Sequence, residues 1–370
     1  MIVIITQCYP PKIGGIENLV FNLSYQLSKY EKVIVLADQH NFSQDTIFDE
    51  NYKHSFEIRR FGGLKYFRKR QKTKELIKII NSNYVKAIIA ESWKSLEYPI
   101  LKLKKTKIPL LSLVHGNEII IKNIRYKKRI LNTLTNVDKV ICNSNFTLSL
   151  LNNISTEFRD TEVIYPGVAN FENIKEQEIE NINGQPILLT LARLEKRKGH
   201  AEILKVISEL KNDYNNICYI IAGEGEELSN LKKLCSKYKI DENVIFIGPI
   251  NEKQKKFILK KTDIMVMTTL DESRNRSIEG FGISYIEASL FGVPSIASNI
   301  GGTAEAVIHN KTGVIINSIN ELKQSLEHLI QNNETRLLLG KNAKKRALDE
   351  LEWNIQIKKY ISILKEYTKK

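Results

Sequence analysis

The sequence predicts an α/β protein with two doubly wound domains, each built on a mostly parallel sheet. Short apolar runs rich in β-branched residues alternate with stretches of helical periodicity, which is typical of parallel strands joined by helices. The same alternation occurs in both halves of the chain. A length of 370 residues also suits two domains, at roughly 100–200 residues each.

In the first half, a strand is expected at the start of the chain, followed by the loop Gln7–Gly15. Apolar residues then recur from Ile16 to Leu27 at the spacing of one helix face, and Thr73–Ile80 is a further helical stretch. The expected strands are Ile2–Thr6, Lys32–Asp38, Val85–Ser92, Ile108–His115, Asp138–Ser144 and Thr161–Tyr165.

The second half repeats the scheme. Its expected strands are Pro186–Ala192, Ile217–Ala222, Asn243–Gly248, Asp263–Thr268, Val293–Ser298 and Gly313–Ile316. The polar stretch Asn170–Gln185 is interpreted as a linker, which predicts domains at 1–170 and 171–353. Two such domains facing each other would direct the carboxyl ends of their strands toward one deep cleft, where ligands of open α/β sheets bind.

Charge is unevenly distributed along the chain. Residues 1–170 hold 26 basic and 15 acidic residues, a balance of +11, and the remainder holds 30 and 27, a balance of +3. A basic first half indicates an anionic partner such as a membrane surface or a phosphorylated acceptor. A generally lysine-rich proteome is the alternative. Aromatic residues do not alternate with the basic runs, which disfavours nucleic acid.

Composition and segment lengths exclude several classes of protein. With 42% hydrophobic residues the chain is not expected to be disordered. No apolar run approaches the ~18 residues of a membrane span, and the first residues lack the pattern of a secretory signal. The four cysteines form no CxxC pair. We therefore expect a cytoplasmic protein, with peripheral attachment to the inner face of the cytoplasmic membrane as an option.

The clearest local motif runs from Glu279 to Ala288. Its glycines, Gly280 and Gly282, precede an apolar helix, so backbone N–H groups at the start of that helix could hold a phosphate. Glu279 and Glu287 could accept hydrogen bonds from sugar and ribose hydroxyls. An ordinary strand-to-helix turn with solvated acids is the alternative.

Three further segments follow expected strands. The basic turn Arg193–Gly199 supplies arginine and lysine donors that suit a diphosphate, although a solvated turn has the same composition. The Gly14–Gly15 pair lets a backbone approach a ligand closely. His115 ends a strand, where it could face the ligand or be structural. Neither a P-loop nor a metal-binding pattern occurs, so no metal ligands are predicted.

Taken in order, these motifs resemble glycosyltransferase family 4, whose members are retaining enzymes of the GT-B fold. The resemblance runs from residue 3 to about residue 355. It rests on Gly14-Gly15 with Glu17, Asn143-Ser144, Pro166-Gly167-Val168, Arg193 with Lys198-Gly199, Gly223-Glu224-Gly225, Glu279 with Glu287, Gly292-Val293-Pro294 and Gly301-Gly302. It implies that the second domain holds a nucleotide-sugar, that the first holds the acceptor, and that a helix at about 354–370 packs back on the first domain.

The resemblance also implies residue roles. Arg193 and Lys198 would hold the donor diphosphate, and Glu279 would bind donor-sugar hydroxyls. His115 would approach the reacting centre. The remaining donor contacts would come from Gly14 and Gly15, the backbone around Phe281, Gly282 and Ile283, the ribose-binding Glu287, and a base site at Phe246–Ile250 that includes Gly248.

The expected function is metal-independent, retaining transfer of a hexose from GDP-mannose, or from a UDP-hexose, with no cofactor and no enzyme nucleophile. The acceptor would be a glycan or a polyprenyl-diphosphate-linked glycan of cell-surface polysaccharide synthesis. The motif style is closest to GDP-mannose-dependent mannosyltransferases. The alternatives are a sugar-nucleotide epimerase, a glycan phosphorylase or a non-catalytic nucleotide-sugar-binding protein.

Overall fold

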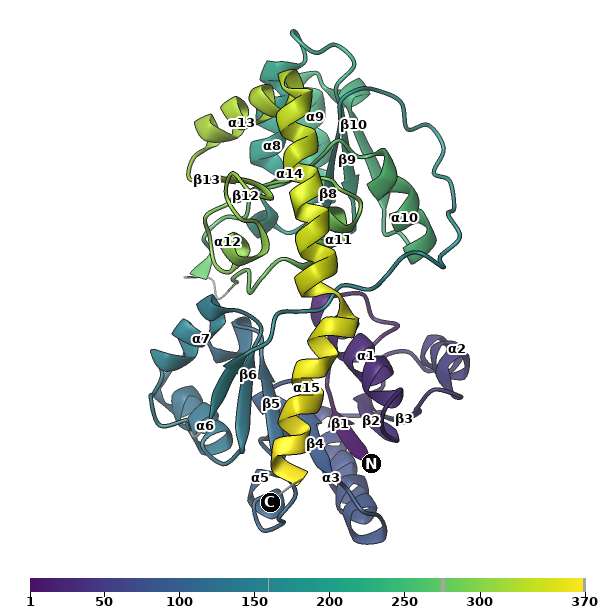
Figure 1. Cartoon of the computed structure of the whole chain (residues 1–370), viewed down its shortest axis with the longest axis vertical. Helices are drawn as coiled ribbons and strands as arrows, with labels where there is room; N and C mark the ends of the chain where they lie inside the picture. The colour runs from purple at the N-terminus through teal and green to yellow at the C-terminus, as the bar shows by residue number, and fades with distance from the viewer. Residues whose placement is uncertain (159, 274–276, 369–370) are drawn as a thin grey trace. The chain divides into compact units, whose positions relative to one another are not determined.

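The computed structural model describes residues 1–158, 160–273 and 277–368 of the chain. The chain divides into two compact units (Figure 1). Unit 1 consists of Met1–Gly167 and Trp353–Lys370, and unit 2 consists of Val168–Glu352. Both units combine parallel strands with helices, as the alternating pattern predicts.

Unit 1 contains, in its described residues, a seven-stranded sheet of order β3-β2-β1-β4-β5-β6-β7, and every pairing is parallel. The first four strands in sequence are β1 (Ile2–Ile5), β2 (Val33–Asp38), β3 (Glu57–Phe61) and β4 (Ala87–Ala90). The last three are β5 (Leu110–Val114), β6 (Lys139–Cys142) and β7 (Thr161–Val163). The order reverses between β1 and β4, which creates a topological switch point.

Helices cover both faces of this sheet because its strands are apolar on both sides. In β1, Val3 and Ile5 belong to one hydrophobic cluster and Ile2 and Ile4 to the other. The first cluster is completed by α3 (Lys65–Ser82), α4 (Trp93–Leu96), α5 (Ile100–Leu103), α6 (Ile124–Leu134) and α7 (Asn145–Asn152). The second is completed by α1 (Gly15–Ser28), α2 (Phe42–Tyr52) and α15 (Trp353–Thr368).

The C-terminal helix α15 belongs to unit 1, although it follows unit 2 in sequence. It contacts α1 (Figure 1). Ile357 and Tyr360 are buried in its contact face, and the Trp353 ring lies against Gly167, where a Cβ atom would come within 2.5 Å of the ring. The glycine is therefore required by the close approach of the ring.

Unit 2 contains, in its described residues, a six-stranded parallel sheet of order β10-β9-β8-β11-β12-β13. Its strands are β8 (Ile187–Leu191), β9 (Cys218–Ala222), β10 (Val244–Gly248), β11 (Ile264–Met267), β12 (Ser295–Ser298) and β13 (Gly313–Ile316). Its helices are α8 (His200–Leu210), α9 (Leu228–Tyr238), α10 (Glu252–Lys261), α11 (Ile283–Leu290), α12 (Thr303–Ala306), α13 (Ile319–Gln331) and α14 (Asn333–Arg346). This strand order also reverses at its centre, between β8 and β11.

Each strand expected from the sequence is present, but β3 was not predicted. It is an edge strand that pairs only with β2 among the described strands, and its sequence, Glu-Ile-Arg-Arg-Phe, is too polar for the apolar-run criterion. Arg59 contacts Glu57 and Glu75, and Arg60 contacts Asp49 at 2.7 Å. These tertiary partners allow charged residues in the strand.

Residues 170–185, interpreted above as a linker, contain no helix or strand and belong to unit 2. They are attached to α10 by hydrogen bonds. The Gln177 amide donates to the Lys253 carbonyl at 3.3 Å, and Lys256 Nζ donates to the Ile174 carbonyl at 2.9 Å. The segment is thus part of the surface of unit 2.

The packing of α15 can be tested because both tryptophans, Trp93 and Trp353, lie in unit 1. Ile357→Ala should lower the free energy of unfolding of unit 1 by about 2–5 kcal/mol, since the lost side chain is 1% exposed. Urea titration followed by tryptophan fluorescence measures this change. Lys358→Ala, on the exposed side of α15, should shift the value by less than about 0.5 kcal/mol. Equal effects of the two substitutions would refute this packing.

Candidate functional site

The turn after β8 carries the basic segment predicted to bind an anion. Leu194 is fully buried, and Lys196–Lys198 form a short 3-10 helix, η2, that ends at Gly199. Gly199 has φ of 69°, and a Cβ atom there would lie 1.9 Å from the Thr268 carbonyl oxygen. The Leu270 amide also donates to the Arg197 carbonyl at 2.8 Å. These contacts hold the turn against the segment that follows β11, across the switch point of the sheet.

Three charged side chains meet at this point. Arg197 Nη1 lies 2.7 Å from Glu279 Oε2, and Lys198 Nζ lies 2.5 Å from the same oxygen. The Arg197, Lys198 and Glu279 side chains are 5%, 11% and 13% exposed. Among the described residues no hydrogen bond to Glu279 Oε1 is present, so this oxygen is available to a ligand. We call these three residues the Glu279 cluster.

The two cations determine the charge of Glu279. Burial alone would raise the pKa of Glu279, but Lys198 and Arg197 outweigh burial and lower this pKa to about 2. Burial also lowers the pKa of Lys198, and the Glu279 carboxylate opposes that shift only in part. Glu279 is consequently a carboxylate at neutral pH, and it can only accept hydrogen bonds.

The glycine loop beside the cluster leads directly into α11. Gly282 is the N-cap of that helix with φ of 101°, and no side chain caps the helix. Ser284 Oγ donates to the Leu191 carbonyl at 2.7 Å, which attaches the first turn of α11 to the end of β8. The N-terminus of α11 therefore lies at the same carboxyl edge as the Glu279 cluster and offers backbone N–H groups to an anion.

A second glycine turn supports the backbone of Glu279. The Gly302 amide donates to the Glu279 carbonyl at 2.9 Å. A Cβ atom on Gly301 would lie 2.3 Å from that carbonyl oxygen, and φ of Gly301 is 68°. Only glycine fits this approach without displacing the Glu279 backbone.

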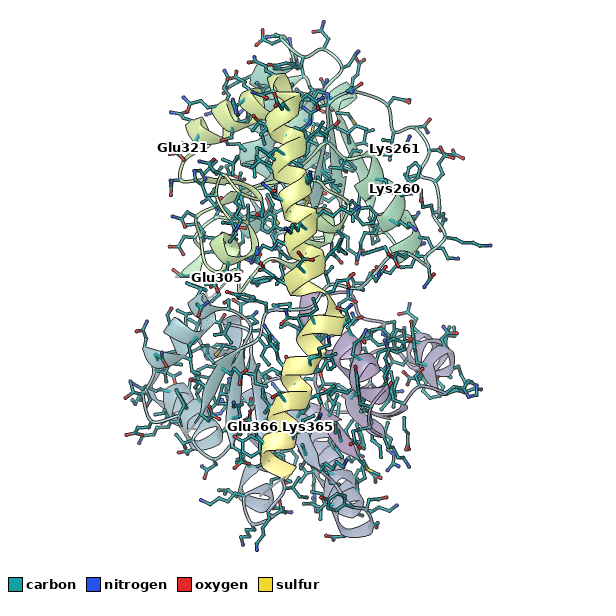
Figure 2. The ribbon with its side chains drawn as sticks, viewed as in Figure 1. Lys260, Lys261, Glu305, Glu321, Lys365 and Glu366 are labelled. Carbon is teal, nitrogen blue, oxygen red and sulfur yellow. The ribbon has the colours of Figure 1, made fainter. Side chains whose placement is uncertain are left out.

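Glu287, predicted to bind ribose, is buried and paired with a lysine that the sequence analysis did not select. Its Oε1 lies 2.8 Å from Lys255 Nζ on α10. Burial would lower the pKa of Lys255, but the Glu287 and Glu252 carboxylates outweigh burial and hold this pKa above its ordinary value. Lys260 and Lys261, labelled in Figure 2, are exposed at the end of the same helix.

The structure brings together several predicted site residues and leaves others apart. Lys198, Glu279 and the Phe281–Ile283 segment lie at one edge of unit 2. Arg193 is 59% exposed and contacts Glu195 at 2.7 Å, not Glu279. Gly248 ends β10 with φ of 69°, and its carbonyl accepts from the Gly223 amide at 2.8 Å.

His115, Gly14 and Gly15 belong to unit 1. His115 is 8% exposed, and its Nε2 lies 2.8 Å from the Glu91 carbonyl. Because a carbonyl accepts a hydrogen bond, Nε2 carries the proton in the neutral ring and Nδ1 is left as an acceptor. Gly14 precedes α1, and a Cβ atom there would lie 2.1 Å from the buried Glu17 carboxylate.

Two residues of the site were missed, although each had a signal in the sequence. Arg197 lies in the same basic run as Lys198, but spacing alone does not tell which arginine points inward. Lys255 lies three and four positions before Ile258 and Leu259, both fully buried, so it occupies the buried face of α10. Lysine is rarely buried without a partner, and that combination indicates a buried ion pair.

A pocket of about 310 Å³ lies at the same carboxyl edge, and none of its lining residues belongs to the Glu279 cluster. It is lined mainly by Thr268–Asp271, Ser298–Ile300 and Asn317–Ile319, which follow β11, β12 and β13. Within residues 1–158, 160–273 and 277–368, no group of three His, Cys, Asp or Glu residues is arranged to hold a metal ion. None of the helices described there combines the length and apolarity needed to cross a membrane.

Comparison with protein families identifies the two halves. Residues 13–169 match the model of Glycosyltransferase Family 4, and residues 172–346 match that of Glycosyl transferases group 1. Together the two matches account for most of the chain. The protein belongs to glycosyltransferase family 4.

Curated relatives of similar sequence include mannosyltransferases. The GDP-mannose-dependent alpha-(1-6)-phosphatidylinositol monomannoside mannosyltransferase of Mycobacterium tuberculosis is 26% identical over 183 residues, 49% of this chain and 48% of that protein. This match thus spans about half the length of the relative. A GDP-mannose-dependent monoacylated alpha-(1-6)-phosphatidylinositol monomannoside mannosyltransferase of Corynebacterium glutamicum is 22% identical over 96% of this chain and 94% of its own length.

Solved structures show the same fold. HepE of Anabaena in complex with UDP-glucose has a TM-score of 0.80 at 17% identity, with 99% of this chain and 100% of that chain covered. A glycosyltransferase from Rickettsia africae has a TM-score of 0.81 at 21% identity, with 99% and 98% covered. The two α/β units are therefore the Rossmann-like domains of the GT-B fold.

The Glu287–Lys255 pair predicts a stability effect. Lys255→Met should destabilise unit 2 by about 3–5 kcal/mol, because it leaves a buried carboxylate without its counter-charge. Thermal unfolding followed by far-UV circular dichroism measures the loss. Lys253→Met, an exposed position on the same helix, is the control and should have little effect. Adding Glu287→Leu to Lys255→Met should recover much of the loss. Persistent destabilisation in the double variant would contradict the ion-pair explanation.

Proposed function

We propose that the protein transfers a hexosyl group from a nucleotide-sugar to a hydroxyl of a glycan or lipid-linked glycan acceptor. The observation that carries this proposal is the Glu279 cluster beside the uncapped N-terminus of α11. Departure of a nucleoside diphosphate concentrates negative charge on the leaving phosphate. Lys198 and the oriented backbone N–H groups of α11 can stabilise that charge.

The charge of Glu279 supports a binding role for this residue. A carboxylate with a pKa of about 2 accepts hydrogen bonds from sugar hydroxyls but cannot donate a proton at neutral pH. Its Oε2 is already bound by two cations, which lowers its nucleophilicity. We therefore propose retention of configuration without an enzyme nucleophile. The mechanism is also proposed to be metal-independent, since Lys198 and the backbone N–H groups of α11 could neutralise the diphosphate.

GDP-mannose is the proposed donor. The mycobacterial and corynebacterial relatives are GDP-mannose-dependent mannosyltransferases, which supports this donor. HepE, which has the same fold, binds UDP-glucose, so a UDP-hexose is the alternative. His115 is proposed to act near the reacting centre, as the family resemblance implies.

The donor proposal is tested by thermal unfolding with a panel of nucleotides. GDP at 100 times its dissociation constant should stabilise the protein by about 2.7 kcal/mol, and UDP should give less. Lys198→Met should abolish most of the GDP effect, whereas Lys196→Met, at the exposed neighbouring position, should not. Stabilisation by UDP but not by GDP would indicate a UDP-hexose as the donor in place of GDP-mannose. No response to any nucleoside diphosphate would remove the proposed function.

We further infer that unit 1 binds an anionic membrane surface through α3. Leu64, Tyr66 and Phe67 are 74%, 60% and 54% exposed at the start of this helix, and the Tyr66 ring lies 6.3 Å from that of Tyr98. Arg70, Lys74 and Lys78 are exposed farther along the same side. Exposed aromatic side chains beside cations that have no acidic partner among the described residues fit the interface of an anionic bilayer.

In the sequence, Arg59–Lys78 is a basic run that could attract an anionic membrane, but several of its cations are paired with acids. Arg68 and Lys72 contact Asp38 at 2.8 and 2.5 Å, and Lys69 contacts Glu97 at 3.0 Å. Arg59 and Arg60 are likewise paired with acids, as described above. The membrane proposal therefore depends on the exposed residues of α3 and not on the whole run.

Sedimentation with vesicles tests this surface. Binding to vesicles that contain anionic lipid should weaken with salt and be absent with purely zwitterionic lipid. Phe67→Ser and Lys74→Gln should each weaken it, and a cation is expected to contribute about 1 kcal/mol. Lys205→Gln, an exposed cation of unit 2, is the matched control. Binding that is independent of salt, or equally affected by the control, would contradict the proposal.

A further inference from the structure

Glu279 is bound by two cations, and the side chain of one is restrained by more contacts than that of the other. Lys198 reaches the carboxylate at the end of a flexible four-carbon chain, and Glu279 is the partner it contacts. Arg197 contacts Glu279 and also lies 3.4 Å from Glu195 Oε2 through its other terminal nitrogen. Its planar guanidinium is therefore fixed between two carboxylates.

The backbone also fixes Arg197. Its carbonyl accepts from the Leu270 amide, and its residue is 4% exposed, whereas the side chain of Arg193 in the same turn is 59% exposed. Arg197 Nε is buried without a hydrogen-bond partner among the described residues. Burying the Nε donor of Arg197 without a partner is unfavourable. We therefore infer that the charge of Arg197 has a function.

The proposed reaction makes different demands on the two cations. A donor diphosphate carries more negative charge than one carboxylate, so it would attract the Lys198 ammonium, whose flexible side chain can reorient. Glu279 would then be a buried carboxylate that had lost part of its counter-charge, and its pKa would rise. A second cation that stays in place would keep Glu279 ionised.

We propose that Arg197 is a positioning residue, which holds the Glu279 carboxylate through Oε2 and leaves Oε1 for donor-sugar hydroxyls while Lys198 interacts with the diphosphate. This inference rests on the proposed function. It assigns Arg197 no contact with the donor. Its loss should therefore affect recognition of the sugar and the rate of transfer more than binding of the nucleoside diphosphate.

The experiment compares Arg197→Gln and Arg197→Lys with Lys196→Gln, an exposed control in the same turn. Isothermal titration gives the affinity for GDP and UDP, and initial rates with the active nucleotide-sugar give kcat and KM. Arg197→Gln should lower kcat/KM by roughly 10- to 100-fold, as expected for a lost charged hydrogen bond, and change the nucleoside diphosphate affinity by less than about threefold. Lys196→Gln should resemble the wild type.

The pH profile separates positioning from a structural role. In the wild type Glu279 remains ionised down to about pH 2. In Arg197→Gln the pKa of Glu279 should rise, so the acid limb of kcat/KM should move to higher pH. Arg197→Lys retains a positive charge and should restore most of the acid limb. A merely structural role would lower the melting temperature without moving this limb.

The stability of the protein gives a readout that needs no substrate. A carboxylate with a lowered pKa stabilises the folded state above its unfolded pKa, and this contribution is lost as the pH falls through the folded pKa. Between about pH 5 and pH 2, Arg197→Gln should therefore lose less folding free energy than the wild type. Lys196→Gln should lose as much as the wild type. If the pH dependence of stability is unchanged in Arg197→Gln, the proposed interaction of Arg197 with the Glu279 carboxylate is wrong.

The outcomes distinguish this inference from the proposed function. If the wild type binds no nucleoside diphosphate, the proposed function fails even where the acid dependence of stability follows Arg197. If the wild type binds and transfers, but Arg197→Gln lowers nucleoside diphosphate affinity as much as kcat/KM, then Arg197 contacts the diphosphate and the positioning role is wrong. Unchanged kcat/KM in Arg197→Gln would also overturn it.

Discussion

The carboxylate of Glu279 is buried, and a buried charge is unfavourable unless cations and hydrogen bonds compensate it. Compensation here comes from Arg197 and Lys198, which follow a different strand of the same sheet. The attraction is strong because water is largely excluded, and it outweighs burial in determining the pKa. Much of the surrounding backbone serves to bring these groups together.

Several glycines make that approach possible. Gly199 allows the basic turn to contact the segment after β11, and Gly301 allows a neighbouring turn to contact the Glu279 carbonyl. A side chain at either position would overlap backbone atoms, which cannot move as a side-chain end can. Gly199 and Gly301, which entered the sequence analysis only as parts of longer motifs, are therefore packing requirements of the ion cluster.

The strand order explains why the cluster forms where it does. In both sheets the order reverses at the centre, between β1 and β4 and between β8 and β11. The connections leave in opposite directions at such a point and leave room beyond the carboxyl ends of the strands. In unit 2 the turn after β8 and the start of α11 occupy the two sides of this position. The strand order thus determines that the charged residues of the site lie at this edge of the sheet.

The positive charge of the first half has two separate structural roles. Lys72 is buried and donates to the Thr6 carbonyl at 2.7 Å, and Arg60 is nearly buried beside Asp49. Such cations connect the ends of neighbouring strands within unit 1. Arg70, Lys74 and Lys78 face solvent instead. A net charge counted from sequence cannot separate these roles, because it does not record which side chains have partners.

Local sequence determined the α/β class, the alternation of elements and the family, because apolar periodicity and glycine positions are properties of short segments. It also selected Lys198, Glu279 and the loop before α11, which the fold brings to one edge of unit 2. It did not reveal β3, whose two arginines also pair with acids on α2 and α3. It did not show that Arg197, and not Arg193, contacts Glu279, or that Lys255 pairs with Glu287. Those pairings join separate strands and helices, and only the packing of the sheet decides which neighbouring side chain is buried.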